Sequence, residues 1–393
     1  MTDLFQRSIE VILSNQAPTG AYLASPNFPS YRYSWFRDGA FIAYAMDLAG
    51  QHESAQRFHD WAARTVLRHA DKAQRAIEKA QRGEPLVDDY LHTRYTVGGE
   101  EAGDEWPNFQ LDGFGTWLWA LAEHDRRQRT AHRCSGLPAH WQQAVDLVVR
   151  YLAALWLHPC YDLWEEHPQY LHPYTLAAIY AGLKAADSME AAVGGSFGFA
   201  QDRRSSAVVE EIRRFVLERG VRDGRLVKHI TPPSGIAAVG GPFGRAQGRP
   251  RSTVVDASLL GVATPYRLLA PGDPIMRATV ARIEADLRRK GGGVHRYRGD
   301  TYYGGGEWVL LTAWLGWYYA DLEEHERAQE LLAWIEAQAD ERGDLPEQVP
   351  HTLNAPSMYQ PWVNHRGTIA KPLLWSHAAY LILRRHLGDQ RPP

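Results

Sequence analysis

Apolar residues recur at helical spacing from one end of this chain to the other, and this pattern limits the fold more than any other feature. Period-two alternation, which would indicate strands, is scarce. The pattern predicts an all-α fold of about twelve helices. They cover residues 3–15, 39–50, 52–68, 111–128, 138–157, 172–187, 205–219, 256–264, 274–289, 307–320, 322–340 and 372–387.

The connections between these helices alternate in length. Most loops after even-numbered helices are short, whereas the loops after odd-numbered helices are long: 16–38, 69–110, 158–171, 220–255, 290–306 and 341–371. Helices joined by short loops run antiparallel, so the long loops should emerge at one end. This predicts an (α/α)6 barrel, in which six helical hairpins surround a funnel lined by those loops. Since no Pro- or Ser-rich linker divides the chain, we expect one domain over residues 1–393.

One internal repeat stands apart from the helical pattern. GGSFGFAQDRRSSAVVE at 194–210 is echoed by GGPFGRAQGRPRSTVVD at 240–256 and occurs nowhere else, which argues against a solenoid. The Gly, Arg, Pro and Ser content predicts two exposed loop insertions without a catalytic part. A basic loop that binds an anion is the alternative.

Charge and cysteine content exclude several kinds of partner. A formal net charge of −3 does not favour nucleic acid or an anionic membrane, since both attract a basic surplus. The longest uncharged apolar stretch, Trp308 to Ala320, is shorter than the ~20 residues that span a bilayer. Cys134 and Cys160 imply no disulfide framework, and the N-terminal MTDLFQRSIEVILSNQ predicts an amphipathic helix and not a signal peptide. We therefore expect a cytoplasmic protein.

The aromatic residues favour a neutral ligand rich in hydroxyl groups. The chain has 14 Trp and 19 Tyr, and many stand in predicted loops beside Gly, Pro and acids, although core packing is the alternative for any one ring. No Walker loop, dinucleotide fingerprint, HExxH or paired CxxC is present, and the 17 histidines lack ligand spacing. The sequence therefore supports a sugar-like partner and predicts neither a cofactor nor a metal ion.

Two carboxylates stand in settings suited to opposite proton-transfer roles. Glu165, in YDLWEEH, lies between Trp164 and Glu166, and a desolvating ring beside a like charge favours the protonated acid. The alternative is a solvated pair near a helix start. Glu347, in GDLPEQV, follows Pro and precedes an amide, which suits an ionised base; the alternative is a surface glutamate. Glycoside hydrolysis uses one carboxyl group of each kind, on opposite sides of the scissile bond.

Two further loop clusters suit a ligand with many hydroxyl groups. In YRYSWFRDG, Arg37 and Asp38 can grip neighbouring hydroxyls beside Trp35, unless Asp38 is only a helix N-cap. In GVHRYRGDTYYGGGEW, Arg296 and Asp300 stand among glycines that permit close approach of the backbone. WPNFQLDG and KPLLWSH repeat the combination of aromatic and polar residues.

Together these motifs resemble glycoside hydrolase family 15, the family of glucoamylases, glucodextranases and isomaltose glucohydrolases. YRYSWFRDGAF, YDLWEE, GGVHRYRGDTYYGGGEW, GDLPEQV and KPLLWSHAAY match its motif blocks in order, from about residue 20 to residue 387. The resemblance implies an (α/α)6 barrel and an inverting, exo-acting α-glucosidase that releases β-glucose from non-reducing ends.

The resemblance also implies a role for each motif residue. Glu165 would be the general acid and Glu347 the general base. The residues implied to bind substrate are Tyr31 beside the attacking water, Trp35 and Trp375 in the wall of the innermost subsite, Arg37 and Asp38 on its glucose, Trp164 beside the acid, Arg296 and Glu166 near the first two subsites, and Asp300 in support of this region.

The chain departs from many bacterial members in its form. Its first predicted helix begins almost at residue 1, so we expect no N-terminal β-sandwich domain. This form is most similar to isomaltose glucohydrolase and favours short α-1,6-linked substrates, with maltooligosaccharides and trehalose as alternatives. A non-catalytic sugar-binding protein, an epimerase and a lyase are alternatives from other classes. An inverting pair requires ~6.5–9.5 Å between the carboxyl groups of Glu165 and Glu347.

Overall fold

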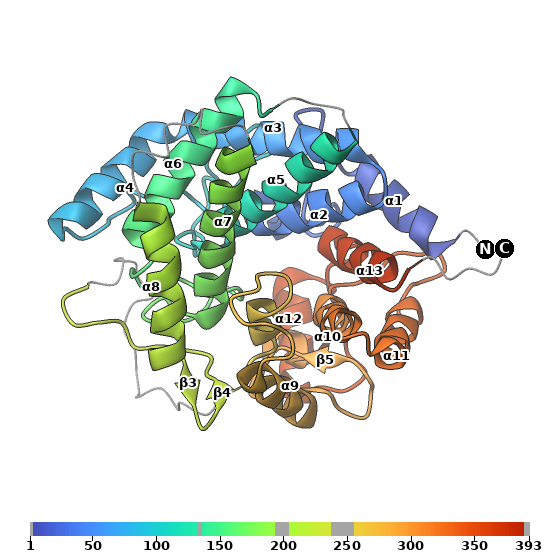
Figure 1. The fold of residues 1–393 in the computed structure, drawn as a ribbon. Helices are drawn as coiled ribbons and strands as arrows, with labels where there is room; N and C mark the ends of the chain where they lie inside the picture. The colour runs from blue at the N-terminus through green and yellow to red at the C-terminus, as the bar shows by residue number, and fades with distance from the viewer. Residues whose placement is uncertain (1–2, 132–135, 193–203, 237–254, 389–393) are drawn as a thin grey trace.

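The computed structural model describes residues 3–131, 136–192, 204–236 and 255–388, and α-helices dominate this part of the chain (Figure 1). The α-helices are α1 (Leu4–Ser14), α2 (Phe36–Leu48), α3 (His52–Arg68), α4 (Ala70–Arg82), α5 (Asp112–Thr130), α6 (Ala139–Leu155), α7 (Pro173–Ala192), α8 (Arg204–Arg219), α9 (Pro274–Leu287), α10 (Val309–Asp321), α11 (His325–Glu336), α12 (Tyr359–Arg366) and α13 (Leu374–His386). Short 3-10 helices are η1 (Pro29–Tyr31), η3 (Ala257–Val262), η4 (Tyr302–Gly304) and η5 (Pro356–Met358).

An inner ring of helical elements forms the centre of the molecule. α2, α5, α7, η3, α10 and α13 each contact the next in this order, and α13 closes the ring against α2. An outer layer packs behind them: α3 on α2, α6 on α5, α8 on α7, α9 on η3, α11 on α10 and α1 on α13. The predicted (α/α)6 barrel is therefore confirmed.

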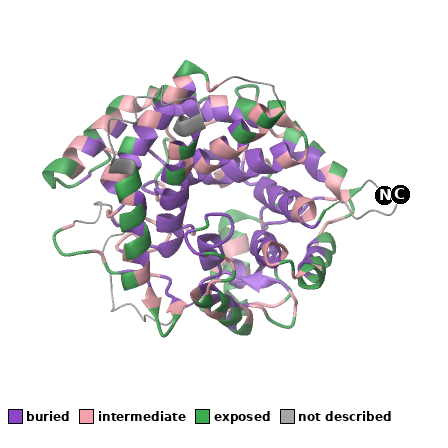
Figure 2. Ribbon diagram, in the orientation of Figure 1, coloured by how far each residue is buried: buried purple, intermediate pink, exposed green. Residues whose placement is uncertain are grey.

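The composition of the inner helices explains why they lie inside. α10 is buried continuously from Val309 to Tyr319, because its residues there are apolar or small on every side. α2 is buried from Phe36 to Asp47, with a mostly apolar middle and charged residues at its two ends. Figure 2 shows this buried interior beneath outer helices whose solvent side is exposed. α5 and α7 approach closely at Gly115, where a Cβ atom would lie 2.4 Å from the carbonyl oxygen of Ala178.

Two-residue strands pair within and between the long loops. β1 (Ser34–Trp35) pairs antiparallel with β2 (Arg94–Tyr95), and β3 (Val221–Arg222) with β4 (Arg225–Leu226). β5 (Val294–His295), β6 (Glu307–Trp308) and β7 (Gln348–Val349) form an antiparallel sheet with β6 in the middle. In this register Glu307 lies opposite His295 on one side and Val349 on the other, so the last two chemical loops are held together.

The structure differs from the predicted helices in three segments. α4 and α12 form within segments predicted to be loops. Their sequences did not predict them because neither helix buries a full apolar face: α4 buries only Ala73, Ala76 and Ile77, and α12 buries none of its residues. The segment predicted as a helix over 256–264 forms the shorter 3-10 helix η3. The alternation of long and short connections survives these differences.

The ends of the repeated segments are not exposed loops. Residues 204–210 lie at the start of α8, and Asp256 is fully buried, where its side chain caps η3. Residues 194–203 and 240–254, like Cys134, lie outside the described residues. Among the helices that the structure describes, none is both long and apolar enough to cross a membrane.

His377 joins α13 to the last long loop. Its Nε2 accepts a hydrogen bond from the Leu345 backbone (3.0 Å), so the neutral ring donates from Nδ1 to Ser8 Oγ (2.9 Å). Complete burial lowers the pKa of His377 to about 3. The ring therefore stays neutral in the folded protein at pH values where the unfolded chain takes up a proton.

We expect the contribution of His377 to the stability of the protein to decline between pH 7 and pH 5. The folded-state pKa of His377 lies below the unfolded value of ~6.5, so its contribution is present above that value and declines as the pH falls. At pH 5 the loss from this residue alone is about 2 kcal/mol. Urea unfolding of wild type and His377→Gln at both pH values measures this decline. The stability of wild type relative to the variant should be lower at pH 5 than at pH 7. The same relative stability at both pH values would contradict the lowered pKa of His377.

Candidate functional site

A large cavity lies at the end where the inner helices begin. Its volume is about 750 Å³, within the range of small-molecule sites. Five of the six long loops contribute to its wall. The lining residues are Ala24, Phe28, Ser30, Tyr31, Trp35, Arg37, Asp38, Glu105, Trp106, Pro107, Tyr161, Leu163, Trp164, Glu165, Glu166, His167, Pro168, Gln169, Arg296, Thr301, Tyr302, Trp308, Leu310, Glu347, Trp362, Arg366, Leu373 and Trp375.

Glu165 projects from a tight turn just before α7. The Asp162 carboxylate accepts hydrogen bonds from the backbone N–H groups of Trp164 and Glu166, both at 2.9 Å. The Asp162 carbonyl accepts from the Glu165 N–H at 2.9 Å. Glu165 has a φ of 66°, which costs a residue with a Cβ atom about 1–2 kcal/mol. The turn therefore imposes an unfavourable backbone geometry on Glu165, as is common at functional sites.

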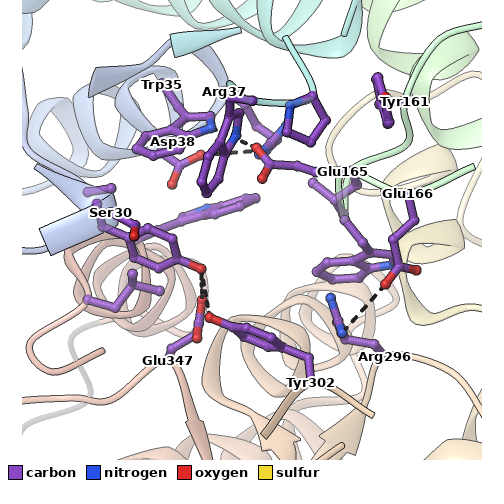
Figure 3. A pocket seen from close by; sticks show the side chains of 18 of the residues that line it. Ser30, Trp35, Arg37, Asp38, Tyr161, Glu165, Glu166, Arg296, Tyr302 and Glu347 are labelled. Carbon is purple, nitrogen blue, oxygen red and sulfur yellow. Dashed lines mark hydrogen bonds and ion pairs between the residues drawn. The ribbon is translucent and has the colours of Figure 1, made fainter. Parts of the chain in front are cut away.

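The Glu165 carboxylate is held by two side chains from other loops. Its Oε1 accepts hydrogen bonds from Trp35 Nε1 at 2.9 Å and from Gln110 Nε2 at 3.3 Å. The side chain is partly exposed to the cavity. Figure 3 shows the carboxyl group facing the cavity across from Glu347. The two carboxyl groups thus share one cavity and lie on opposite sides of it.

Glu347 is buried, with 3% of its surface exposed. The Tyr31 hydroxyl, which also contacts the Tyr302 hydroxyl at 3.0 Å, donates to its Oε1 at 3.0 Å. Its Oε2 accepts no hydrogen bond from the described residues. Burial raises the pKa of Glu347 to about 7, although the hydrogen bond from Tyr31 opposes this rise. The structure thus differs from the readily ionised setting predicted from GDLPEQV, and the carboxyl group is suited to exchanging a proton near neutral pH.

The segment that bears Glu347 is fixed by the start of α13. The Ser376 hydroxyl donates to the Pro346 carbonyl at 2.8 Å, and the Glu347 N–H donates to the Ala370 carbonyl at 2.9 Å. β7 follows directly and pairs with β6. Backbone contacts on both sides therefore orient the carboxyl group.

Arg37 and Asp38 lie in the first turn of α2, where Trp35 occupies the N-cap position. The alternative that Asp38 is the N-cap is therefore wrong. Arg37 Nη1 donates to Gln110 Oε1 at 2.7 Å and to Asp112 Oδ2 at 3.1 Å. Burial raises the pKa of Asp38 to about 7, despite the nearby Arg37 charge. Asp38 Oδ2 and Arg37 Nε lie 3.5 Å apart as an ion pair and form no hydrogen bond with the described residues, and both side chains line the cavity.

Arg296 forms the opposite wall, together with aromatic rings. Its guanidinium pairs with the buried Asp300, with Nε 2.8 Å from Oδ2, and stands 5.2 Å from the centre of the Trp164 ring. Arg296 Nη2 lies 4.0 Å from Glu166 Oε1, the ion pair drawn in Figure 3. Asp300 itself does not line the cavity; it orients Arg296 from behind.

The structure brings together every predicted site residue except Asp300, which lies one layer behind. Trp375 lines the cavity beneath Arg37, 5.6 Å from the guanidinium, and stacks on Phe41. Four residues that were not singled out also belong here: Trp106, Gln110, Tyr302 and Trp308. All four stand in motifs quoted from the sequence, so the motifs were informative but the individual residues were not distinguished.

We expect Glu347 to titrate near pH 7 and Tyr31→Phe to move this transition upward. Removing the Tyr31 hydroxyl removes the hydrogen bond that lowers the pKa of Glu347. Infrared difference spectra of the protonated carboxyl band against pH measure the transition, and Glu347→Gln identifies the band. A band in wild type that titrates near pH 4 would contradict the effect of burial.

Comparisons with known proteins agree with this geometry. The family model described as "Glycosyl hydrolases family 15" matches residues 2–343. The chain is 40% identical over 389 residues to an isomaltose glucohydrolase from Kribbella flavida, and the match covers 98% of this chain and 93% of the relative.

Solved structures share the fold. A glycosidase variant in complex with glucose superposes with a TM-score of 0.86 at 39% identity, covering 98% of this chain and 96% of the other. A bacterial glucoamylase complexed with acarbose superposes with a TM-score of 0.67 at 19% identity, covering 97% of this chain and 55% of the other, and supports the fold alone.

Proposed function

Because the chain belongs to glycoside hydrolase family 15 and is a glycoside hydrolase, we propose that it removes glucose from the non-reducing end of short α-glucosides with inversion, using Glu165 as acid and Glu347 as base. The observation that supports these roles most is the pair of carboxyl groups on opposite sides of one cavity, each held by a different set of donors. Inversion needs this arrangement, because water attacks from the face opposite the leaving group.

In the proposed reaction the Glu165 proton passes to the glycosidic oxygen as the bond from that oxygen to the anomeric carbon breaks. Water attacks the anomeric carbon from the Glu347 side and loses its proton to Glu347. Glu347 Oε2 has no protein partner among the described residues, so it is available for that water, while Tyr31 fixes Oε1. The position of both carboxyl groups on one cavity supports these two roles, and the assignment of acid and base is a proposal that rests on the family resemblance.

The other site residues suit a neutral glucosyl unit. Asp38 and Arg37 line the cavity as an ion pair of a carboxylate acceptor and a guanidinium donor, and the Trp35 and Trp375 rings offer flat faces to the sugar. Arg296 and Glu166 lie farther along the wall and suit the next sugar unit. We propose isomaltose and short isomaltooligosaccharides as substrates, since the relative that matches over 93% of its length is named an isomaltose glucohydrolase.

Glucose release from isomaltose, panose, isomaltotriose, maltose and trehalose tests the proposal, with proton NMR following the first anomer. We expect β-glucose from isomaltose first, because inversion of an α-linkage gives the β-anomer. Faster cleavage of maltose or trehalose would change the proposed substrate and leave the proposed mechanism unchanged. α-Glucose as first product would refute inversion. The single domain and the cytoplasmic location stay predictions from the sequence.

We expect Glu165→Gln and Glu347→Gln each to lower kcat by at least about 10³-fold, since the amide neither gives nor takes the proton. Circular dichroism and urea unfolding check that the variants fold. Glu105→Gln is a matched control, because Glu105 also lines the cavity but is exposed and has no proposed role. Near-normal turnover by either catalytic variant would refute its assignment.

A further inference from the structure

Lys228 follows β4 and is buried, with 6% of its surface exposed, yet it does not line the cavity. Its Nζ lies 3.0 Å from Asp256 Oδ2, 3.6 Å from Asp162 Oδ2 and 3.9 Å from Glu166 Oε2. The centre of the Tyr297 ring lies 3.6 Å away. One ammonium group therefore contacts three carboxylates behind the cavity wall.

Each of these carboxylates holds part of the turn around Glu165. Asp162 accepts the backbone N–H groups of Trp164 and Glu166. Asp256 accepts the Trp164 indole N–H, at 3.0 Å to each oxygen. Glu166 accepts the Tyr297 hydroxyl at 2.6 Å. The residues on both sides of Glu165 are thus anchored by groups that meet at one ammonium.

The three carboxylates require the ammonium group of Lys228 to compensate their negative charge. Three carboxylates within 4 Å of one point repel one another unless a cation lies between them, and a buried charge without a partner is costly. His172 and His229 do not supply that cation, because burial lowers their pKa values. His167 lies 3.8 Å from Glu166 Oε2, on one of the three carboxylates, and Lys228 joins all three. Arg296 is paired with Asp300 and approaches only one of the three carboxylates, Glu166, at 4.0 Å.

We propose that Lys228 is a positioning residue for the general acid, which keeps the turn of Glu165 in its strained geometry by joining Asp162, Asp256 and Glu166. This inference rests on the proposed function, because it takes Glu165 as the proton donor. Lys228 touches neither the substrate nor the reacting atoms. Its loss should therefore impair proton donation to the leaving group more than binding of the glucosyl unit.

A substrate that needs no proton distinguishes this role from a structural one. α-Glucosyl fluoride loses fluoride as water attacks, so it depends little on a general acid, whereas an alkoxide leaving group must take a proton. For Lys228→Met we expect kcat on the best natural α-glucoside of the panel to fall at least about tenfold more than kcat on the fluoride, with little change in KM. Lys228→Arg, which keeps the charge, should recover part of the loss.

Lys72→Met is the matched control. Lys72 is also mostly buried in an ion cluster, 2.7 Å from Glu101 and 3.3 Å from Asp88, but it contacts no residue of the cavity wall that the structure describes. We expect it to leave the ratio of the two rates unchanged. Unfolding curves show which variants fold. If Lys228→Met does not fold, the same ratio of kcat on the natural substrate to kcat on the fluoride, measured for Lys228→Arg, tests the inference.

Equal losses on both substrates in a folded Lys228 variant, or no loss, would overturn the inference. Glu165→Gln, measured alongside, tests the proposed function separately. This variant should lose activity on the natural substrate and retain hydrolysis of α-glucosyl fluoride. If Glu165→Gln cleaves the natural substrate normally, the proposed acid is wrong whatever Lys228 does. If Glu165→Gln behaves as expected and Lys228→Met does not, only the inference about Lys228 fails.

Discussion

The site depends on one constraint, that every inner element of the barrel begins at the same end. The first N–H groups of a helix have no partner within it, and the helix dipole is positive there, so this end favours carboxylates. N-cap positions of the inner ring belong to the site or support it: Trp35 before α2, Asp256 before η3, Trp308 before α10 and Leu373 before α13. The functional side chains therefore lie where rigid, buried helices begin, and each long loop orients only a few of them.

The two proposed catalytic carboxyl groups are anchored to this frame in different ways. Glu347 is followed by a strand and bonded through its backbone to the segment before α13, so its position is set by regular structure. Glu165 stands in an irregular turn with positive φ and depends on side chains, with Trp35 and Gln110 on its carboxylate and Asp162 on its flanking backbone. A turn held by side chains is sensitive to charges behind it, and the cluster around Lys228 lies there.

The barrel and the site motifs could be predicted from the sequence because both leave local patterns. Helical periodicity and the alternation of loop lengths predicted the ring, and Glu165 and Glu347 stood in distinctive motifs. α12 could not be found this way, since it buries none of its residues. Lys228 and Asp256 also escaped, because their role comes only from contacts with residues distant in the chain. For the same reason GDLPEQV did not predict the raised pKa of Glu347, which arises from burial by other loops.

The pairing of charges also determines what kind of ligand suits the cavity. Arg37 and Arg296 are the buried arginines of its wall, and each is paired with a fully buried aspartate, Asp112 and Asp300 respectively. Their charge is largely compensated there, so Asp38, like Glu347 across the cavity, keeps a pKa raised to about 7 by burial. A wall of compensated arginines and readily protonated carboxyl groups offers hydrogen bonds rather than net charge. Such a wall suits a neutral polyhydroxyl ligand better than an anion, as a glucoside requires.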